Sequence, residues 1–504
     1  MRKQSFNAPQ VVFLFLALLC RIAGGANVIS PVTLAAVLPS AAESRVSEPS
    51  PKAAKPNVII FLSDTLRADF LSCYGYPYPT SPNIDAFARR AVLFEKCYAQ
   101  SAWTKPSVAS MLTGYVPSVH QAIRGCTGLG PEDQPRVPVL REQFVTLGEK
   151  FRDAGYQTAV FQMNSNLLKE HGFAQGFEHY QFMFWADPAA QMDETLLWLE
   201  SQAREPFLLY VHLRDPHWKY VPPPEMLAAV FGKAPAPSEQ DQKILEFYQT
   251  RHIEYDAWIG DHEPKHELSL WDLSPQGLEA LRRQYAGEVR YIDDQFSRLM
   301  EKVAELNVAD HTIIAVVSDH GEAFKDHGNF GHGLSLYDEL LHVPLIIGPL
   351  GLKTGRRVAH NVRMFDLYPS LLTLCAIDPP AGIQAESLFA PNGSVSVRKD
   401  RLVFSETDRR QPLFENWLAC VIDGRYKLIH DLKNHTQQFF DLKQDPREND
   451  RSVKTNQAEK VNLLRSLRLY SEENAALAAK FGPQECMVLD QETREQLRAI
   501  GYVQ

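Results

Sequence analysis

The sequence has no excess of positive charge. Its 504 residues include 52 lysines and arginines against 61 aspartates and glutamates, a formal net charge of −9. Proteins whose main task is to bind nucleic acid usually carry a basic face, so we expect no nucleic-acid partner. Zinc-finger spacing, sustained heptads and long-period repeats are also lacking, which excludes coiled-coil, collagen-like and solenoid folds. The remaining composition, 45% apolar and 22% charged, is that of an ordinary globular protein.

A long apolar run is missing as well. The run near the N-terminus, residues 11–20, is shorter than the roughly 20 residues needed to span a bilayer. Basic residues precede it and small residues follow it, which is the order of a secretory signal. We therefore predict a signal peptide over residues 1–26, a linker over residues 27–56, and an exported protein, periplasmic or extracellular. No stable membrane span is expected after the signal is removed.

The seven cysteines do not define a disulfide framework. Removal of Cys20 with the signal would leave an even number, but no spacing fixes a pairing. A domain of this size does not need cross-links, so isolated buried thiols are an equally good interpretation.

Three apolar runs with helical stretches between them predict buried strands of a mostly parallel α/β sheet. They are residues 58–62, 207–213 and 312–317. Each run ends in polar residues, and the carboxyl ends of parallel strands meet at one edge of a sheet. The residues at these ends include Asp64, Asp215, His217, Asp319 and His320.

These strand ends predict a metal site. A single aspartate after a strand is more often a cap or turn residue. Several on different strands favour a shared ligand, because two carboxylates brought together repel unless a cation or proton lies between them. Asp64, Asp319 and His320 would suit calcium, magnesium, manganese or zinc, and one ion is favoured over a two-zinc arrangement.

Residues 101–114 predict a short helix with a reactive hydroxyl at its start. Pro106 suits the first turn of a helix, and Gly114 suits a left-handed C-terminal cap. Thr104 would then lie just outside the N-terminus, where N–H groups favour an anion. A threonine there is usually a cap, but beside a cation its hydroxyl becomes a candidate nucleophile.

The motifs together resemble the sulfatase family of the alkaline-phosphatase superfamily. They are FLSDTLRAD at 61–69, CYGY at 73–76, SPNID at 81–85, TKPS at 104–107, LTG at 112–114, DPH at 215–217, SDHGE at 318–322, DHG at 326–328, GHG at 331–333, LYDE at 336–339 and HVPLI at 342–346. The resemblance implies hydrolysis of sulfate or phosphate esters with one divalent metal ion, calcium before manganese, magnesium or zinc. The substrate would be a small-molecule, glycan or lipid ester.

The same resemblance assigns roles to individual residues. The implied metal ligands are Asp64, Thr104, Asp319 and His320. The implied catalytic residues are Thr104 as nucleophile, with His217 and His332 contacting the ester or its leaving oxygen. His327 and Lys105 are further candidates for substrate binding.

Two departures from the family pattern change the expected chemistry. Typical sulfatases have Cys-x-Pro-x-Arg, with the first residue oxidised to formylglycine, where this sequence has Thr104 and Val108. The β-methyl group of threonine blocks that oxidation, so we predict direct attack by Thr104 and release of its ester by water, which favours phosphate over sulfate. A phosphoryl or phosphodiester transferase and a catalytically silent binding protein remain as alternatives.

The predicted fold is a large mixed, mostly parallel sheet flanked by helices, followed by a small antiparallel subdomain. The catalytic domain would span residues 57–395 and the C-terminal α+β subdomain residues 396–504. Asp423-Gly424 in the latter is a strong hairpin signal. Residues 222–278 would form either a lid over the site or a solvated excursion.

Overall fold

The computed structural model describes residues 55–123, 136–183, 187–233, 235–250, 268–348, 355–411, 414–449 and 456–488, all within one compact unit. The predicted signal peptide lies outside these ranges and stays a prediction, as does nearly all of the linker. Within the described ranges, every helix is too short or too polar to cross a lipid bilayer.

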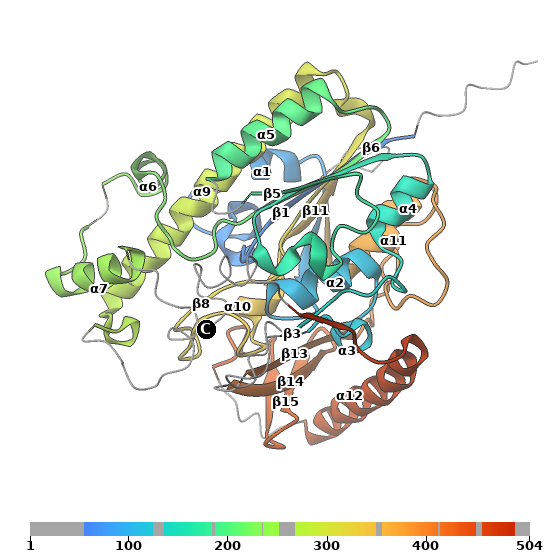
Figure 1. The fold of residues 1–504 in the computed structure, drawn as a ribbon. Coiled ribbons are helices and arrows are strands. Elements are labelled where there is room, and N and C mark those ends of the chain that lie inside the picture. Colours follow the sequence, from blue (N-terminus) through green and yellow to red (C-terminus); the bar gives the residue numbers. More distant parts are fainter. Residues whose placement is uncertain are drawn as a thin grey trace, which may run out of the picture. The chain divides into compact units, whose positions relative to one another are not determined.

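A nine-stranded mixed sheet forms the centre of the protein (Figure 1). The strands lie in the order β10–β2–β11–β7–β1–β6–β4–β5, with β12 paired to β2. The run β7–β1–β6–β4–β5 is parallel, while β10 and β11 are antiparallel to their neighbours. This arrangement confirms the predicted fold class. The bounds are β1 Asn57–Ser63, β2 Val92–Tyr98, β4 Gln157–Gln162, β5 His179–Phe182, β6 Phe207–Leu213, β7 Thr312–Val317, β10 His342–Val343, β11 Leu345–Gly348 and β12 Arg356–Arg363.

Helices cover both faces of this sheet because the central strand is apolar on both sides. In β1, Ile59 and Phe61 enter one hydrophobic cluster, and Ile60 and Leu62 enter another on the opposite face. The first cluster includes side chains of α1 Pro82–Ala88, α5 Pro188–Ser201 and α9 Pro275–Glu305. The second includes side chains of α2 Thr104–Thr113, α3 Pro117–His120, α4 Leu147–Asp153 and α11 Leu367–Leu374.

A second, antiparallel sheet of four strands lies in the C-terminal part of the chain, as predicted. Its strands are β13 Val403–Gln411, β14 Phe414–Ile422, β15 Tyr426–Asp431 and β16 Gln437–Asp441. Gly424, in the turn between β14 and β15, has φ 97°, a conformation that glycine adopts without strain. One face of this sheet packs on α12 Gln457–Ala478.

Edge strand β13 joins this smaller sheet to the larger one. Glu406 N donates to Gln100 O at 2.9 Å, and Ser405 Oγ donates to Ala99 O at 2.6 Å. The boundary predicted at residues 395/396 falls between α11 and β13, and the division into two domains stays a prediction.

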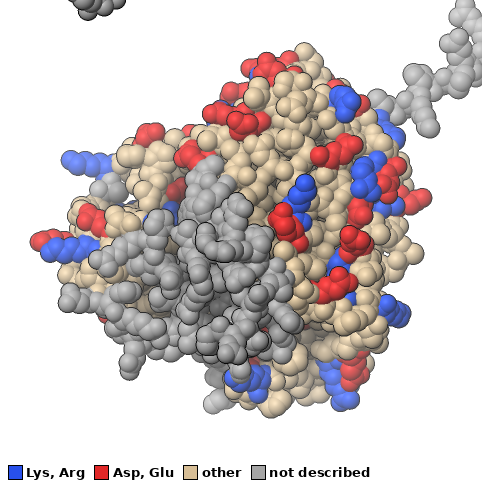
Figure 2. Space-filling view, in the orientation of Figure 1, with Lys and Arg blue, Asp and Glu red and all other residues tan. Residues whose placement is uncertain are grey.

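The segment predicted as a lid contains helices that pack beside α9 (Figure 1). They are α6 Pro224–Phe231 and α7 Glu239–Thr250. Residues 251–267 lie outside the described part of the chain, so the lid stays a prediction. Figure 2 shows acidic and basic side chains mixed over the described part of the face in view.

The described cysteines are free thiols: Cys73, Cys97, Cys375, Cys420 and Cys486. The interpretation as isolated buried thiols fits Cys97, Cys375 and Cys420, whereas Cys73 is half-buried and Cys486 is exposed.

Candidate active site

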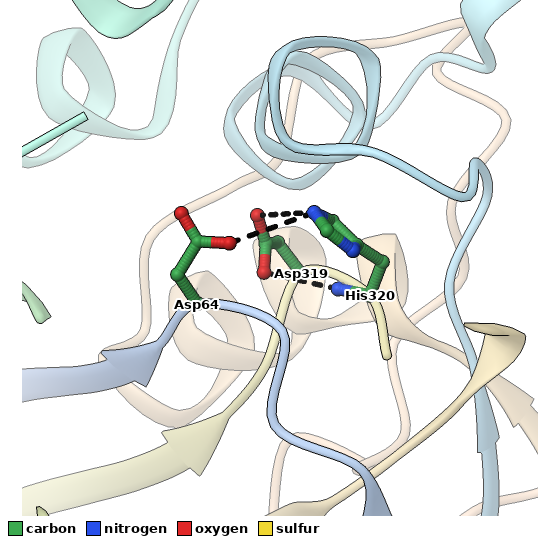
Figure 3. Close-up of side chains that lie close together, drawn as sticks. All are labelled: Asp64, Asp319 and His320. Atoms are coloured by element: carbon green, nitrogen blue, oxygen red, sulfur yellow. Dashed lines mark hydrogen bonds and ion pairs between the residues drawn. The ribbon is translucent and has the colours of Figure 1, made fainter. Parts of the chain in front are cut away.

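Asp64, Asp319 and His320 meet at the carboxyl ends of the adjacent parallel strands β1 and β7 (Figure 3). One ligand atom from each lies within 4.8 Å of the others. All three residues are fully buried. The two strands pair in register, so the residues that follow them are brought side by side.

The hydrogen bonds of His320 show that this group fits a cation. Its Nδ1 lies 2.9 Å from Gly321 O, so Nδ1 carries the proton and Nε2 presents a lone pair. That Nε2 lies 3.5 Å from Asp64 Oδ1 and 3.4 Å from Asp319 Oδ2. Neither carboxylate oxygen has a hydrogen-bond partner among the described residues. Three electron pairs facing one another in a dry pocket are unfavourable unless a positive charge lies between them.

The carboxyl groups of Asp64 and Asp319 differ in pKa because their electrostatic surroundings differ. Burial by itself would raise the pKa of Asp64, but a hydrogen bond from His212 and the nearby His217 and His320 outweigh it, so the pKa falls well below its usual range. Burial and the neighbouring Asp64 raise the pKa of Asp319. Donors of this kind, two carboxylates and one imidazole, suit a divalent ion.

Thr104 places a hydroxyl beside the same imidazole. Its Oγ1 lies 3.3 Å from His320 Nε2, and the residue is only 2% exposed. Helix α2 begins at Thr104 itself, after extended Trp103, so the prediction that Thr104 lies just outside the helix is wrong by one residue. Gly114 ends α2 in a left-handed conformation, as predicted.

His217 and His332 lie next to this group. Their ring centroids are 5.1 Å apart, and the His332 ring is 4.4 Å from that of His320. His332 Nδ1 lies 2.9 Å from Glu322 Oε1, and His217 Nδ1 lies 3.0 Å from Trp218 O. Each ring is therefore oriented through its Nδ1 contact.

The structure places the two predicted substrate-binding residues differently. Lys105 is fully buried in the first turn of α2. Burial of the His171 ring lowers its pKa to about 3, and the charge of the Lys105 ammonium adds to this effect. His327 is held elsewhere: Nδ1 lies 2.8 Å from Glu339 Oε1, and Nε2 lies near the carbonyls of Arg447 and Glu448. Both ring nitrogens are thus engaged in contacts with other parts of the chain, and the structure does not bring His327 to the group around Asp64.

Two residues join the site without having been predicted. Asn164 Nδ2 donates to Asp64 Oδ2 at 2.7 Å and to Thr104 Oγ1 at 3.2 Å. His212 Nε2 lies 3.4 Å from Asp64 Oδ2. In the sequence, Asn164 lies near the end of the apolar strand β4 and His212 near the end of β6. Their position at these strand ends is the feature that could have identified them, because β6 lies beside β1 and β4 lies beside β6 in the sheet.

A mixed sheet with buried acids, imidazoles and a hydroxyl at its carboxyl edge is the arrangement of a sulfate or phosphate ester hydrolase. The family model described as Sulfatase matches residues 56–377, and the chain therefore belongs to the sulfatase family. A second model, N-sulphoglucosamine sulphohydrolase, C-terminal, matches residues 325–474.

Individual relatives agree with this assignment. The chain is 26% identical to N-acetylglucosamine-6-O-sulfatase of Bacteroides thetaiotaomicron, over 83% of this chain and 86% of that protein. It is 25% identical to human iduronate 2-sulfatase, over 64% of this chain and 70% of that protein. Among solved structures, the phosphonate monoester hydrolase of Agrobacterium radiobacter shares the fold with a TM-score of 0.66 at 22% identity, covering 86% of this chain and 97% of that one.

Proposed function

We propose that this protein hydrolyses sulfate or phosphate esters with Thr104 as its nucleophile. The reaction uses one divalent ion, with calcium preferred over the other metals, held by Asp64, Asp319, His320 and Thr104. The observation that carries the proposal is the Thr104 hydroxyl, buried and 3.3 Å from an imidazole nitrogen that faces two carboxylates. A divalent ion in such a site lowers the pKa of a hydroxyl beside it and offsets charge on the ester oxygens.

The attacking atom is Thr104 Oγ1. Asn164 Nδ2 donates to this oxygen and so fixes the rotamer of the hydroxyl. The N-terminal N–H groups of the ten-residue helix α2 favour the negative charge of an ester bound in front of them. In the first step Thr104 Oγ1 gives up its proton to solvent and forms a bond to sulfur or phosphorus, and the bond to the alcohol oxygen breaks.

His217 donates a proton to the leaving alcohol, and His332 stabilises negative charge on the ester. Burial lowers the pKa of His217 to about 4, so the ring is neutral at pH 7. A bound anion raises that pKa, because the nearby negative charge favours the imidazolium form. His217 then protonates the departing alcohol through Nε2, while His332, oriented by Glu322, stabilises the transferring oxygens.

Thr104 favours phosphate over sulfate as the transferred group. A threonine ester cannot be released by the elimination open to an aldehyde hydrate, so water must displace Thr104 directly at phosphorus or sulfur. In this second step the bond to Thr104 Oγ1 breaks, a bond to a water oxygen forms, and a proton lost by that water restores the Thr104 hydroxyl.

We further propose a glycan or other small-molecule ester as substrate and export as the destination of the protein. The names of relatives that act on N-acetylglucosamine or iduronate sulfates support the first proposal. The order of basic, apolar and small residues at the N-terminus supports the second.

The test is turnover of 4-nitrophenyl sulfate, 4-nitrophenyl phosphate, bis(4-nitrophenyl) phosphate and a phosphonate monoester with calcium, magnesium, manganese or zinc. Thr104→Val removes the hydroxyl at nearly constant volume and should lower kcat by about a thousandfold or more. Thr113→Val, on the same helix, is the matched control, because its hydroxyl bonds to Ala109 O and Tyr115 N, at the other end of α2 from Thr104. Undiminished turnover by Thr104→Val would show that Thr104 is not the nucleophile. Absence of turnover in the unaltered protein with every ester would favour a binding protein.

A further inference from the structure

The loop that follows β1 has an unusual backbone conformation directly beside a proposed metal ligand. Thr65, the residue after Asp64, has φ 58°, in the left-handed region. This region is costly for β-branched residues, because Cβ comes too close to the following carbonyl oxygen. A threonine persists there only where its surroundings fix the backbone, and such residues cluster at functional sites. The contacts that hold Thr65 in this conformation therefore bear on the site.

Two amides of this loop donate to the loop that follows β7. Thr65 N donates to Asp319 Oδ1 at 3.3 Å. The next amide, Leu66 N, donates to Ser318 Oγ at 2.9 Å, and Ser318 Oγ donates to His320 O at 2.8 Å. All of these residues are fully buried. The loop that carries Asp64 is thus bonded to the loop that carries the other two acidic and imidazole ligands.

The bond from Thr65 orients the carboxylate of Asp319. Oδ1 of Asp319 accepts from Thr65 N and also from His320 N, the latter at 3.0 Å (Figure 3). Oδ2 lies 3.4 Å from His320 Nε2 and has no hydrogen-bond partner among the described residues. Because two amides hold Oδ1, the carboxylate cannot rotate without losing a bond, and Oδ2 stays turned toward the proposed ion.

A tyrosine of the long helix α9 holds the loop after β1 at two points. Tyr285 Oη donates to Thr65 O at 2.6 Å and accepts from Arg67 N at 2.9 Å. The Tyr285 ring is fully buried against the rings of Phe70 and Phe324, with centroid distances of 4.7 Å and 4.8 Å. This packing fixes the hydroxyl between the two backbone groups. Without the hydroxyl, the loop can relax toward negative φ, and the Thr65 N–H then turns away from Asp319.

We propose that Tyr285 is a positioning residue for the metal site: its hydroxyl holds Thr65 in the left-handed conformation, and Thr65 N in turn orients Asp319. The proposal rests on the proposed function, in which Asp64 and Asp319 hold a divalent ion. It makes α9, a helix of 31 residues on one face of the large sheet, part of the support of the site.

The test is binding of calcium, magnesium, manganese and zinc chlorides to the metal-stripped full-length protein, measured by titration calorimetry. We expect Tyr285→Phe to weaken binding of the most tightly bound ion by about tenfold, as when a hydrogen-bonded partner of a metal ligand is lost. Tyr368→Phe is the matched control. It removes a buried hydroxyl that donates to Val145 O at 3.1 Å, from α11 on the opposite face of the sheet, and should leave the affinity unchanged.

Glycine at position 65 distinguishes positioning from a general loss of structure. Glycine adopts the left-handed conformation without strain, so Thr65→Gly added to Tyr285→Phe should restore the affinity to within about threefold of the unaltered protein. Thr65→Val added to Tyr285→Phe keeps the branched Cβ and should restore nothing. Both substitutions remove the same hydroxyl, which has no hydrogen-bond partner among the described residues.

Equal affinities of the unaltered protein and Tyr285→Phe, or equal effects of glycine and valine in the Tyr285→Phe protein, would overturn the proposal and leave the proposed function standing. Binding of none of the four ions by the unaltered protein would overturn the metal site itself, and this proposal with it. If Tyr285→Phe does not fold, Ser318→Ala tests the same loop, because it removes the acceptor of Leu66 N. Its loss of affinity should again be restored by glycine and not by valine at position 65.

Discussion

His212 Nε2 lies 3.4 Å from Asp64 Oδ2, and both side chains are fully buried. The tyrosine hydroxyl of Tyr210 lies 2.8 Å from His212 Nδ1. If the hydroxyl donates to Nδ1, the ring proton is on Nε2 and faces the carboxylate. Tyr210, His212 and Asp64 thus form a chain of contacts that holds Oδ2 of Asp64, whereas His320 faces Oδ1.

We predict that His212→Gln weakens binding of a divalent ion by about 10- to 100-fold, as is usual when a partner of a metal ligand is lost. Tyr210→Phe should have a smaller effect in the same direction, because it removes only the hydroxyl that fixes the ring. Titration calorimetry of the metal-stripped protein measures the affinity, with the exposed His311→Gln as control. Equal affinities for the unaltered protein and His212→Gln would contradict the prediction.

Glu322 should act through His332. Its carboxylate is fully buried and lies 2.9 Å from His332 Nδ1, so removing it frees the ring to rotate away from the ester. We expect Glu322→Ala to lower kcat by about 10- to 100-fold, with Glu322→Gln, which keeps an acceptor oxygen, closer to the unaltered protein. Glu301→Gln, on the exposed face of α9, is the control. Equal kcat values for Glu322→Ala and Glu322→Gln would show that the contact does not position His332.

Lys427, in β15, joins the C-terminal sheet to an earlier part of the chain. Its buried ammonium lies 2.7 Å from both Asp338 Oδ1 and Glu448 Oε1. Lys427→Met leaves these two carboxylates facing each other, and we expect a loss of about 3–5 kcal/mol in the free energy of unfolding. Urea unfolding measures it. Adding Glu448→Gln to Lys427→Met should recover part of the loss, and additive effects of the two substitutions would contradict the coupling.

His120 makes stability sensitive to acid. Burial lowers its pKa from 6.5 to about 3 in the folded protein. Its Nδ1 accepts from Ala122 N at 3.1 Å, so the ring is held neutral. Below about pH 6.5 the unfolded chain takes up a proton that the folded protein does not. Stability is therefore complete above that pH and is lost by up to about 1.4 kcal/mol per pH unit as the pH falls toward 3.

The check on this acid dependence is urea unfolding between pH 7 and pH 4 for the unaltered protein and for His120→Asn. The variant keeps an acceptor for Ala122 N but has no proton to gain, so its stability should fall less steeply with acid. Parallel curves would mean that His120 does not titrate as described. His171, whose pKa is also lowered to about 3, should add to the slope in both proteins.

The sequence predicted those parts of the site that depend on strand ends. Asp64, Asp319 and His320 follow long apolar strands, and the geometry of parallel sheets brings such ends together. His327 shows the limit of this approach. It lies five residues before His332 in the sequence, but its ring is held by Glu339 and by carbonyls some 120 residues further along the chain. No local pattern contains such a contact.

Asn164 and His212 were missed for a related reason. Their roles depend on the order of the strands, β1 beside β6 and β6 beside β4, and one sequence does not contain that order. The register of β1 and β6, which pairs Leu62 with His212, is what carries the imidazole to Asp64.

The contact of β13 with Ala99 and Gln100 has a consequence for how the protein is made. The segment that leads into Thr104 is flanked by residues synthesised about three hundred positions later. During synthesis most of the large sheet can form early, but the segment before Thr104 lacks its contacts with Ser405 and Glu406 until those residues have left the ribosome. Activity should therefore arise late, as one of the last events of maturation.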